Sequence, residues 1–275
     1  MNNSLASIES ICFMAVLVLY LIATACYFIF AAAKKESFAR IGYIVMAAGF
    51  VVHTVSIVIR GINAGRLPLT NQFEFATAFA WGIALCFLIF VKKYDFNALG
   101  CFVAPVAFLV IGYAAMQSRE IHAVMPALQS NWLGFHVCTA IIAYGSFAVS
   151  FGVSMVYLMK PGLLKSSFMQ KHIPDDDKLD TISYRAVSLG FLFLTLCIIT
   201  GAVWAKRAWG AYWSWDPKET WSLITWIIYA IYLHLRLNKG MRGKQSAIFA
   251  VVGFICVIFT YIGVNTLLAG LHSYK

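Results

Sequence analysis

Charged residues are scarce in this sequence. Asp, Glu, Lys and Arg make up 12% of its 275 residues, whereas 61% are hydrophobic and the mean hydropathy is +0.80. A soluble core of this size has no use for so much apolar surface, so the composition indicates a polytopic membrane protein. The formal net charge of +10 does not indicate nucleic-acid binding, because Lys and Arg lie in short links between apolar segments, as residues that set membrane topology do.

Cysteine motifs are also lacking. The seven cysteines are an odd number, contain no Cys-x-x-Cys pair and all lie in apolar runs. This pattern excludes a disulfide framework, a cysteine metal site and a thiol relay, and we interpret the cysteines as small membrane-buried hydrophobic residues. The first apolar run follows Glu9 and has no Lys or Arg before it. It therefore lacks the basic start of a signal peptide, and we expect it to stay as a membrane anchor.

The apolar residues form eight stretches that are long enough to cross a bilayer. A hydrocarbon core of ~30 Å takes ~20 helical residues. We therefore predict an all-α polytopic membrane protein with about eight transmembrane helices in one integral membrane domain, residues 1–275. The expected spans are roughly 10–32, 41–60, 74–91, 97–116, 132–159, 184–204, 221–238 and 246–270. The longest polar link, 160–183, is expected to form a solvated turn with room for a short surface helix.

The distribution of Lys and Arg predicts the orientation. On one side of the expected membrane, four links contain 14 of the 21 basic residues, and the opposite side contains 7. These four links are 33–40, 92–96, 160–185 and 236–245. Because basic residues favour the cytoplasmic side, we expect both termini to lie outside the cytoplasm. In a bacterium this means a multi-pass protein of the inner, cytoplasmic membrane.

A tryptophan-rich segment precedes the seventh expected span. Five of the eight tryptophans lie in it or just after it: Trp209, Trp213, Trp215, Trp221 and Trp226. At its centre Asp216 can cap a helix, Pro217 suits the first helical position, and Glu219 completes a capping box. A rigid helix start would hold the extracytoplasmic segment, about 205–220, at the membrane surface. Aromatic residues at this density go beyond an ordinary interfacial belt and suit a large, flat, apolar ligand.

The same segment resembles a known signature. Trp209-Gly-Ala-Tyr-Trp-Ser-Trp-Asp-Pro-Lys-Glu-Thr-Trp-Ser-Leu-Ile-Thr-Trp226 is similar to the WWD motif of haem-handling proteins, and above all to the CcsA/ResC family of cytochrome c biogenesis proteins. The resemblance covers most of the chain from about residue 126 onward, and the N-terminal third is similar more loosely. The other similar blocks are Pro126-Ala-Leu-Gln-Ser-Asn-Trp-Leu-Gly-Phe-His-Val137, Leu179-Asp-Thr-Ile-Ser-Tyr-Arg185, Thr200-Gly-Ala-Val-Trp-Ala205, Tyr232-Leu-His-Leu-Arg236 and Gly270-Leu-His-Ser-Tyr274.

The resemblance implies a function in c-type cytochrome biogenesis. Such a protein moves haem b, iron protoporphyrin IX, across or out of the membrane and presents it outside for covalent attachment to a Cys-x-x-Cys-His motif of apocytochrome c. It works with a membrane partner of the CcsB/ResB type. The chain would be the haem-handling subunit of a holocytochrome c synthase active only with that partner, and whether it is itself an enzyme stays open. No side chain is assigned as catalytic. The residues expected to bind haem in the segment are Trp209, Trp213, Trp215, Asp216 and Trp221.

Two histidines are expected at the depth of the Trp-rich segment. His136 lies about four residues into the fifth span, roughly 6 Å below the surface at ~1.5 Å per residue, and His272 lies just beyond the eighth. Two neutral imidazoles on opposite sides of a haem iron are a standard axial arrangement, so we predict that His136 and His272 are the axial ligands at the outer surface. The cations expected on that side, which suit haem propionates, are Arg60, Arg66, Lys206, Arg207 and Lys218.

Two further histidines are expected inside the membrane. His234 follows Trp221 by about 13 residues, roughly 20 Å along a helix, and an ionisable group at that depth is usually functional. The resemblance implies that His234 ligates a second haem iron, with the opposite ligand supplied by the partner protein. His53, near the middle of the second span, is left open between a ligand and a hydrogen-bonded core residue. His122 and His172 are assigned no chemistry.

Two other functions remain open from the sequence alone. One is a membrane b-type cytochrome that carries electrons, which would favour histidine pairs on facing helices at two depths and needs no aromatic platform. The other is a haem-free small-solute transporter, which would favour broken helices and paired intramembrane charges near the midplane. The sequence shows no such pair of acids or bases.

Overall fold

The computed structural model describes residues 3–121, 123, 125, 128–268 and 270–271. Throughout this part of the chain the regular elements are helices, and strands are absent. The long helices are α1 (Asn3–Ala33), α2 (Glu36–Ala64), α3 (Gln72–Tyr94), α4 (Gly100–Ala115), α5 (Asn131–Leu163), α7 (Asp176–Trp209), α8 (Pro217–Lys239) and α9 (Lys244–Ile258). Shorter elements are η1 (Asn97–Leu99), α6 (Ser167–His172), η3 (Phe259–Gly263), which is a π-helix, and α10 (Val264–Leu267).

The eight expected membrane spans are all helices, and the all-α membrane fold is confirmed. Seven of the helices, within the described residues, are long and apolar enough to cross a membrane. The exception is α8, which is 23 residues long but less apolar. Its tryptophans and tyrosines, together with His234 and Arg236, dilute the aliphatic residues of the expected span 221–238. An eighth crossing therefore stays a prediction.

Local sequence signals explain where several helices begin and end. Asp216 caps α8, and Glu219 completes the predicted capping box. Glycines in the left-handed conformation end two helices, Gly65 (φ 65°) after α2 and Gly240 (φ 64°) after α8. Helix α7 begins at Asp176, earlier than the expected span 184–204, so it extends into the charged link. Asp176 and Asp177 lie in its first turn, where carboxylates interact favourably with the helix dipole. The short helix α6 lies in that same link.

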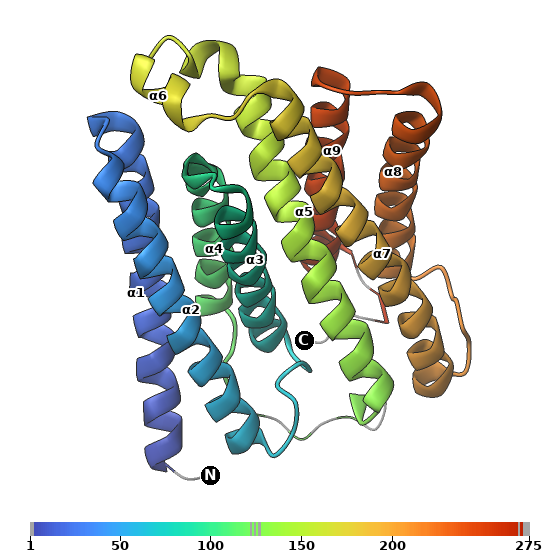
Figure 1. The fold of residues 1–275 in the computed structure, drawn as a ribbon. Helices are drawn as coiled ribbons and strands as arrows, with labels where there is room; N and C mark the ends of the chain where they lie inside the picture. The colour runs from blue at the N-terminus through green and yellow to red at the C-terminus, as the bar shows by residue number, and fades with distance from the viewer. Residues whose placement is uncertain (1–2, 122, 124, 126–127, 269, 272–275) are drawn as a thin grey trace. The chain divides into compact units, whose positions relative to one another are not determined.

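The chain forms two compact units, and we describe each by itself. Unit 1 comprises Met1–Ile121 and Met159–Asp175, and unit 2 comprises His122–Leu158 and Asp176–Lys275. Long helices α1 to α4 belong to unit 1, whereas most of α5 belongs to unit 2 with α7, α8 and α9 (Figure 1). The single domain expected over the whole chain stays a prediction.

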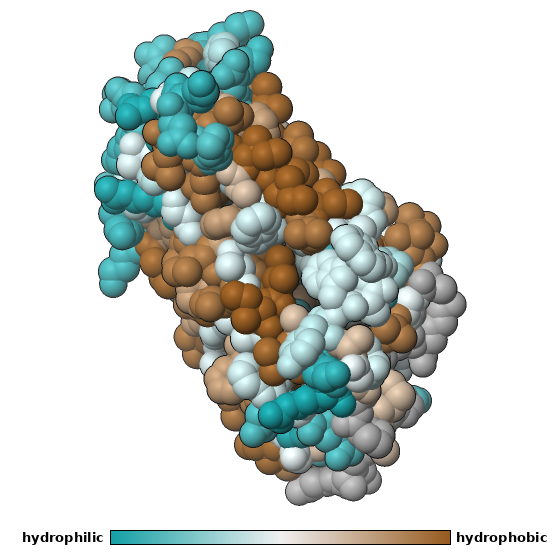
Figure 2. Space-filling model, turned by 90° about the vertical axis from the view of Figure 1, so that its right-hand side faces the viewer, coloured by the Kyte–Doolittle hydropathy of each residue, from teal (hydrophilic) through white to brown (hydrophobic). Residues whose placement is uncertain are grey.

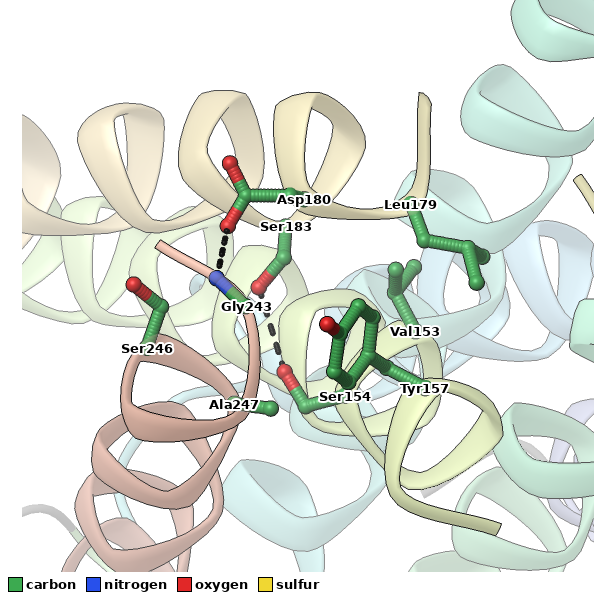
Figure 3. Close-up of a pocket in the computed structure, with 9 residues that line it drawn as sticks. All are labelled: Val153, Ser154, Tyr157, Leu179, Asp180, Ser183, Gly243, Ser246 and Ala247. Atoms are coloured by element: carbon green, nitrogen blue, oxygen red, sulfur yellow. Dashed lines mark hydrogen bonds between the residues drawn. The ribbon is translucent and has the colours of Figure 1, made fainter. Parts of the chain in front are cut away.

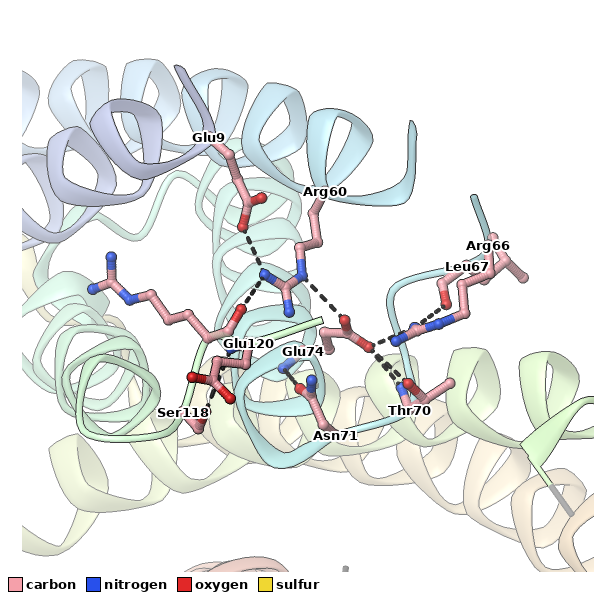
Figure 4. A network of polar contacts seen from close by, with 10 residues as sticks. Glu9, Arg60, Arg66, Leu67, Thr70, Asn71, Glu74, Ser118 and Glu120 are labelled. Carbon is pink, nitrogen blue, oxygen red and sulfur yellow. Dashed lines mark hydrogen bonds and ion pairs between the residues drawn. The ribbon is translucent and has the colours of Figure 1, made fainter. Parts of the chain in front are cut away.

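A buried ionic network closes one end of unit 1. Arg60 of α2 donates to Glu9 of α1 and to Glu74 of α3, both at 3.1 Å, and Arg66 donates to Glu74 at 2.9 Å (Figure 4). The side chains of Arg60 and Glu74 are 5% and 0% exposed. Arg60 also donates to the backbone carbonyl of Arg119. Charges this well buried are tolerated when each has a partner. Because the partners come from α1, α2 and α3, the network joins the ends of these helices.

The helices of unit 2 pack through aromatic rings. Phe147 of α5 stacks on Tyr229 of α8 with ring centroids 3.8 Å apart, and Phe151 of α5 packs against Phe254 of α9. On the face shown in Figure 2, hydrophobic residues dominate the middle and hydrophilic residues gather toward the ends. Exposed aliphatic residues such as Ile199 of α7 and Ile255 of α9, 56% and 58% exposed, fit contact with lipid.

The end of unit 2 opposite the Trp-rich segment is fixed by one carboxylate. Asp180 of α7 accepts hydrogen bonds from Arg236 of α8 at 2.5 Å and from the backbone N–H of Gly243 at 3.0 Å. Beside it, Asp180, Ser183 of α7 and Ser154 of α5 line a small pocket, in which the two serine hydroxyls are hydrogen-bonded (Figure 3). Asp180 thereby joins the start of α7 to the turn between α8 and α9.

Candidate functional site

His136 is held by the backbone of a neighbouring helix. It lies in the second turn of α5, is half-buried, and its Nδ1 is 2.8 Å from the carbonyl oxygen of Cys197 on α7. The Sγ of Cys197 is farther away, 3.5 Å from the same nitrogen. A carbonyl oxygen only accepts, so Nδ1 carries the hydrogen and donates it. The lone pair of the imidazole is then on Nε2, the nitrogen that would ligate a metal, and this arrangement is usual for histidine ligands.

Two tryptophan rings pack in a row next to the His136 imidazole. Trp204 of α7 lies nearly parallel to the His136 ring, with centroids 6.0 Å apart and an interplanar angle of 16°. Trp204 is 1% exposed and meets Trp209 edge to face at 4.7 Å. His136, Trp204 and Trp209 therefore form a continuous row of rings from α5 to the start of the Trp-rich segment. Sequence reasoning missed Trp204, although it lies inside the Thr200–Ala205 block.

The Trp-rich segment presents aromatic faces to the surroundings. Trp215 is 69% exposed and meets Trp213 edge to face at 5.7 Å. Tyr212 is 60% exposed. The indole nitrogen of Trp213 is buried and has no hydrogen-bond partner among the described residues, so it is a donor that a ligand could satisfy. Trp221, at the start of α8, instead packs against Phe259 of the π-helix at 4.2 Å.

The segment is rigid because its turns are bonded internally. Oε2 of Glu219 accepts the backbone N–H of Ser214 at 2.8 Å and that of Asp216 at 3.2 Å. Between these two residues Trp215 adopts a positive φ of 59°, which is uncommon for a residue other than glycine. Such a conformation persists where the surroundings impose it. The carboxylate of Glu219 thus holds the turn that exposes Trp215.

Asp216 connects the segment to the far end of the chain. Its Oδ1 accepts from the backbone N–H of Lys218 at 3.3 Å, as a helix cap does, and its Oδ2 accepts from that of Leu271 at 3.0 Å. A Cβ on Gly270 would overlap this Oδ2. The predicted cap is confirmed, but the second bond joins residues 55 positions apart, which no local pattern can reveal. His272, which follows Leu271, lies outside the described residues.

The predicted cations divide into two groups. Arg60 and Arg66 are paired with Glu74 in unit 1, as described above. Lys206 donates to the Gly210 carbonyl at 2.7 Å and lies 5.6 Å from the ring of Tyr212. The Lys206 ammonium group therefore lies in the Trp-rich segment itself.

The remaining two cations also lie in unit 2. Arg207 lies 5.9 Å from the ring of Trp132. Lys218, which precedes the apolar run 221–238, is half-buried, and burial lowers its pKa to about 8, while Asp216 opposes this shift. Arg207 and Lys218, with Lys206, are therefore the candidates for binding acidic groups of a ligand.

The other histidines lie in separate environments. His234 is exposed near the end of α8 and its Nδ1 is 3.0 Å from the Asn238 amide. His53 is fully buried in unit 1, where its Nδ1 is hydrogen-bonded to the hydroxyl of Tyr20 at 3.1 Å. His172 packs between aromatic rings and lies 3.8 Å from Glu36. His122 lies outside the described residues.

These residues fit an iron porphyrin better than a bare metal ion. Among the described residues, no three or more His, Cys, Asp or Glu side chains come together to hold a metal ion. A porphyrin brings four nitrogen ligands of its own and needs only axial ones from the protein. His136 offers an imidazole with a fixed tautomer, the tryptophans offer flat apolar surface, and Lys206 offers a cation for an acidic side group.

Comparisons with known proteins agree with this chemistry. The family described as "Cytochrome C assembly protein" matches residues 69–272. The chain is 40% identical to the cytochrome c biogenesis protein CcsA of Chlamydomonas reinhardtii, over 84% of this chain and 67% of the relative. It is 34% identical to CcsA of a Prochlorococcus marinus strain, over 87% of this chain and 85% of that relative.

A solved structure has the same fold. The chain matches "Cytochrome c Heme Lyase CcmF" with a TM-score of 0.75 over 97% of its own length, but at only 12% identity. It spans 47% of that longer protein, so the likeness shows the fold alone. The match of the family model over most of the chain and the identity to the two CcsA proteins lead to one conclusion. The chain belongs to the CcsA family of cytochrome c biogenesis proteins.

Proposed function

We propose that the chain holds haem b at an outer site formed by His136 and the Trp-rich segment, and presents it there for covalent attachment to apocytochrome c. The observation that carries the proposal is the hydrogen bond from His136 Nδ1 to the Cys197 carbonyl. It leaves Nε2 as the metal-binding nitrogen in a ring that continues into Trp204 and Trp209. Membership of the CcsA family supports a c-type cytochrome as the product.

The proposed second axial ligand at this site is His272. The hydrogen bond from the backbone N–H of Leu271 to Asp216 supports this assignment, because it ties the neighbouring backbone to the Trp-rich segment. The propionates of the haem are proposed to pair with Lys206, Arg207 or Lys218. A cation near a carboxylate gives a charge-assisted hydrogen bond, which is stronger than a neutral one.

A second haem-binding position is proposed at His234. Its side chain is exposed on α8 rather than packed among the helices of unit 2. An imidazole on an outward face suits an iron whose other ligand comes from a different chain, and we propose a CcsB/ResB-type membrane protein as that partner. Haem would be held first at His234 and then at the outer site. His53, hydrogen-bonded to Tyr20 in unit 1, is not proposed as a ligand.

The attachment reaction places few demands on protein side chains. Haem supplies the iron and two vinyl groups, and each apocytochrome thiol adds its S–H across one vinyl double bond, which forms a C–S and a C–H bond without a leaving group. No protein nucleophile is needed. His136 and the tryptophans fix the plane of the porphyrin and exclude water, so that vinyl carbons and thiols meet in the reactive geometry. We therefore propose a haem-handling subunit that is active with its partner.

The orientation follows from the basic residues. The excess of Lys and Arg in the four links named above supports a cytoplasmic position for these links. The Trp-rich segment and both termini would then face the extracytoplasmic side of a bacterial inner membrane, where apocytochrome c is matured.

The proposal predicts the effect of removing His136. His136→Gly should abolish covalent attachment of haem to a reporter apocytochrome c when the chain and its partner are expressed in a host without its own maturation system. Added imidazole should restore part of the product, because it can fill the vacant axial position. Covalent haem is measured by haem staining and by the pyridine haemochrome spectrum.

Three outcomes separate the possible functions. Normal cytochrome c maturation by the His136→Gly variant would show that His136 is not an axial ligand of the haem iron. A purified complex without haem would favour the solute transporter. A haem spectrum that His136→Gly leaves unchanged, with electron transfer to quinone but no cytochrome product, would favour the b-type electron carrier.

A further inference from the structure

The Thr200–Ala205 block of α7 lies against the proposed haem ligand. Gly201 faces the His136 ring so closely that an added Cβ would lie 2.7 Å from Nδ1 and 2.8 Å from Cε1. Real Cβ atoms essentially never approach other atoms within 3.0 Å. The imidazole therefore occupies the space that any side chain at position 201 would need.

The surroundings of Gly201 fix the ring in two further ways. One turn earlier, the Cys197 carbonyl accepts the Nδ1 hydrogen. Three residues later, Trp204 lies nearly parallel to the imidazole and is itself fully buried. Two successive turns of α7 thus supply a hydrogen-bond acceptor, a gap and a flat aromatic wall for one histidine.

We propose that Gly201 is a positioning residue for haem ligation by His136. It allows the imidazole to reach the Cys197 carbonyl, which keeps the hydrogen on Nδ1 and presents the lone pair of Nε2. This proposal rests on the proposed function, in which Nε2 binds the haem iron. A hydrogen bond from the other nitrogen orients a histidine ligand and makes it a stronger donor. The strength and direction of the axial bond then depend on the absence of a side chain at position 201.

A purely structural role for Gly201 gives a different expectation. Gly190 of the same helix also makes a close approach, since its Cβ would lie 2.5 Å from the Phe147 ring. That contact is between packed helices and involves no histidine. If Gly201 served packing alone, substitution at either position would damage the protein in the same way.

The test compares alanine substitutions at three helical glycines in the full chain, co-expressed with its partner. Gly201→Ala should lower the haem recovered with the complex roughly tenfold, the usual size of the effect when a ligand loses its supporting hydrogen bond. The haem that remains should lose the low-spin spectrum of two histidine ligands. Gly190→Ala should lower the yield of protein but leave the spectrum of bound haem unchanged. Gly112→Ala, at a position with nothing within 4 Å, should change neither.

A double variant keeps the test decisive if Gly201→Ala does not accumulate. In His136→Gly/Gly201→Ala the ring that collides with the new methyl group is gone, so the protein should accumulate like His136→Gly. Imidazole should restore less cytochrome in the double variant than in His136→Gly, because the methyl group occupies the place of the added ring. Equal rescue in the two variants would overturn the proposal.

The spectra of bound haem in the single variants complete the test. A Gly201→Ala complex with the parental spectrum and haem content would overturn the positioning role, as would the same spectral change in Gly190→Ala. A parental spectrum in His136→Gly itself would instead show that the proposed function is wrong, because His136 would then not be the ligand.

Discussion

Asp216 illustrates how one side chain can serve two distant parts of the chain. It is 5% exposed, caps α8 through Lys218, and accepts the backbone N–H of Leu271. A helix cap contributes about 1 kcal/mol, and a hydrogen bond to a charged group about 1.5–3 kcal/mol. Both bonds are made to the same carboxylate, and the one to Leu271, at 3.0 Å against 3.3 Å for the cap, fixes the backbone next to the proposed ligand His272.

Two substitutions separate these roles. Asp216→Asn keeps a good capping residue but removes the charge, and an amide has only one oxygen to share between two N–H donors. We expect this variant to accumulate normally and to mature cytochrome c poorly. Asp216→Ala should mature cytochrome c as poorly as Asp216→Asn does. It should also accumulate less, because the helix cap is lost. Complex yield and covalent haem on the reporter cytochrome measure the two effects.

The matched control is Asn71→Asp at the start of α3. Asn71 caps that helix by accepting the backbone N–H of Glu74 at 2.8 Å, in unit 1. An exchange of amide and carboxylate at this cap should leave maturation unchanged. If Asp216→Asn also behaves like the parent, Asp216 is a helix cap only.

Among the elements, the Trp-rich segment combines a rigid backbone with exposed rings. Glu219 holds the backbone, and Trp215 and Tyr212 remain exposed. An exposed indole gains more from being covered by a ligand than a packed indole does, and burial of a large aromatic face contributes about 1.5–3 kcal/mol. This corresponds to roughly tenfold to a hundredfold in affinity.

We therefore expect Trp215→Ala to reduce the haem retained by the purified complex by roughly tenfold or more. The remaining haem should keep its two-histidine spectrum, since no ligand is touched. Trp213→Ala should reduce retention as well, and the double variant further. Trp81→Ala, in unit 1, removes an indole that stacks on Phe50 and should leave haem retention unchanged. Parental retention in all three Trp213 and Trp215 variants would make the segment an interfacial belt.

The sequence predicted the helices better than it predicted the contacts between them. Apolar runs identified all eight long helices, and the order Asp-Pro-Lys-Glu predicted the capping box of α8 correctly. Such signals are local, because a span needs consecutive apolar residues and a cap needs groups three residues apart. The helix ends were less accurate, as α7 shows, because a helix continues past its apolar part where charged residues suit its first turn.

The main features of the candidate site that the sequence left out are long-range. The bond between His136 and Cys197 joins residues 61 positions apart, and that between Asp216 and Leu271 joins residues 55 apart. Gly201 carries no signal in a single sequence, since a glycine inside a helix has many explanations. The pairing of Arg60 with Glu74 was also missed, so that a buried counter-ion partner was interpreted as a free cation.

For the whole molecule, the two ends of unit 2 differ in chemistry. One end contains His136, the Trp-rich segment and Leu271. The other contains Asp180 with its bonds to Arg236 and Gly243. Helix α8 begins at the first end and finishes at the second, antiparallel to α7 (Figure 1). It therefore extends from end to end of unit 2, although its composition is less apolar than that of the other long helices.

This course of α8 supports eight crossings and predicts the result of reporter fusions. A reporter after Lys93 or after Lys239 should be cytoplasmic, and one after Arg66 or after the last residue should be extracytoplasmic. If α8 failed to cross, the two sides of α9 would exchange, and the reporter after Lys239 would lie outside. Reporter activity is measured with alkaline phosphatase, which is active outside, and with green fluorescent protein, which fluoresces inside.

The C-terminal fusion is the most informative of these. His136 lies near the start of α5, and the four crossings α5, α7, α8 and α9 fix whether the end of the chain shares its side of the membrane. An extracytoplasmic C-terminus keeps His272 on the same side as His136 and the Trp-rich segment. A cytoplasmic C-terminus would separate the two proposed ligands by the thickness of the bilayer, ~30 Å, and no haem iron could then bind both.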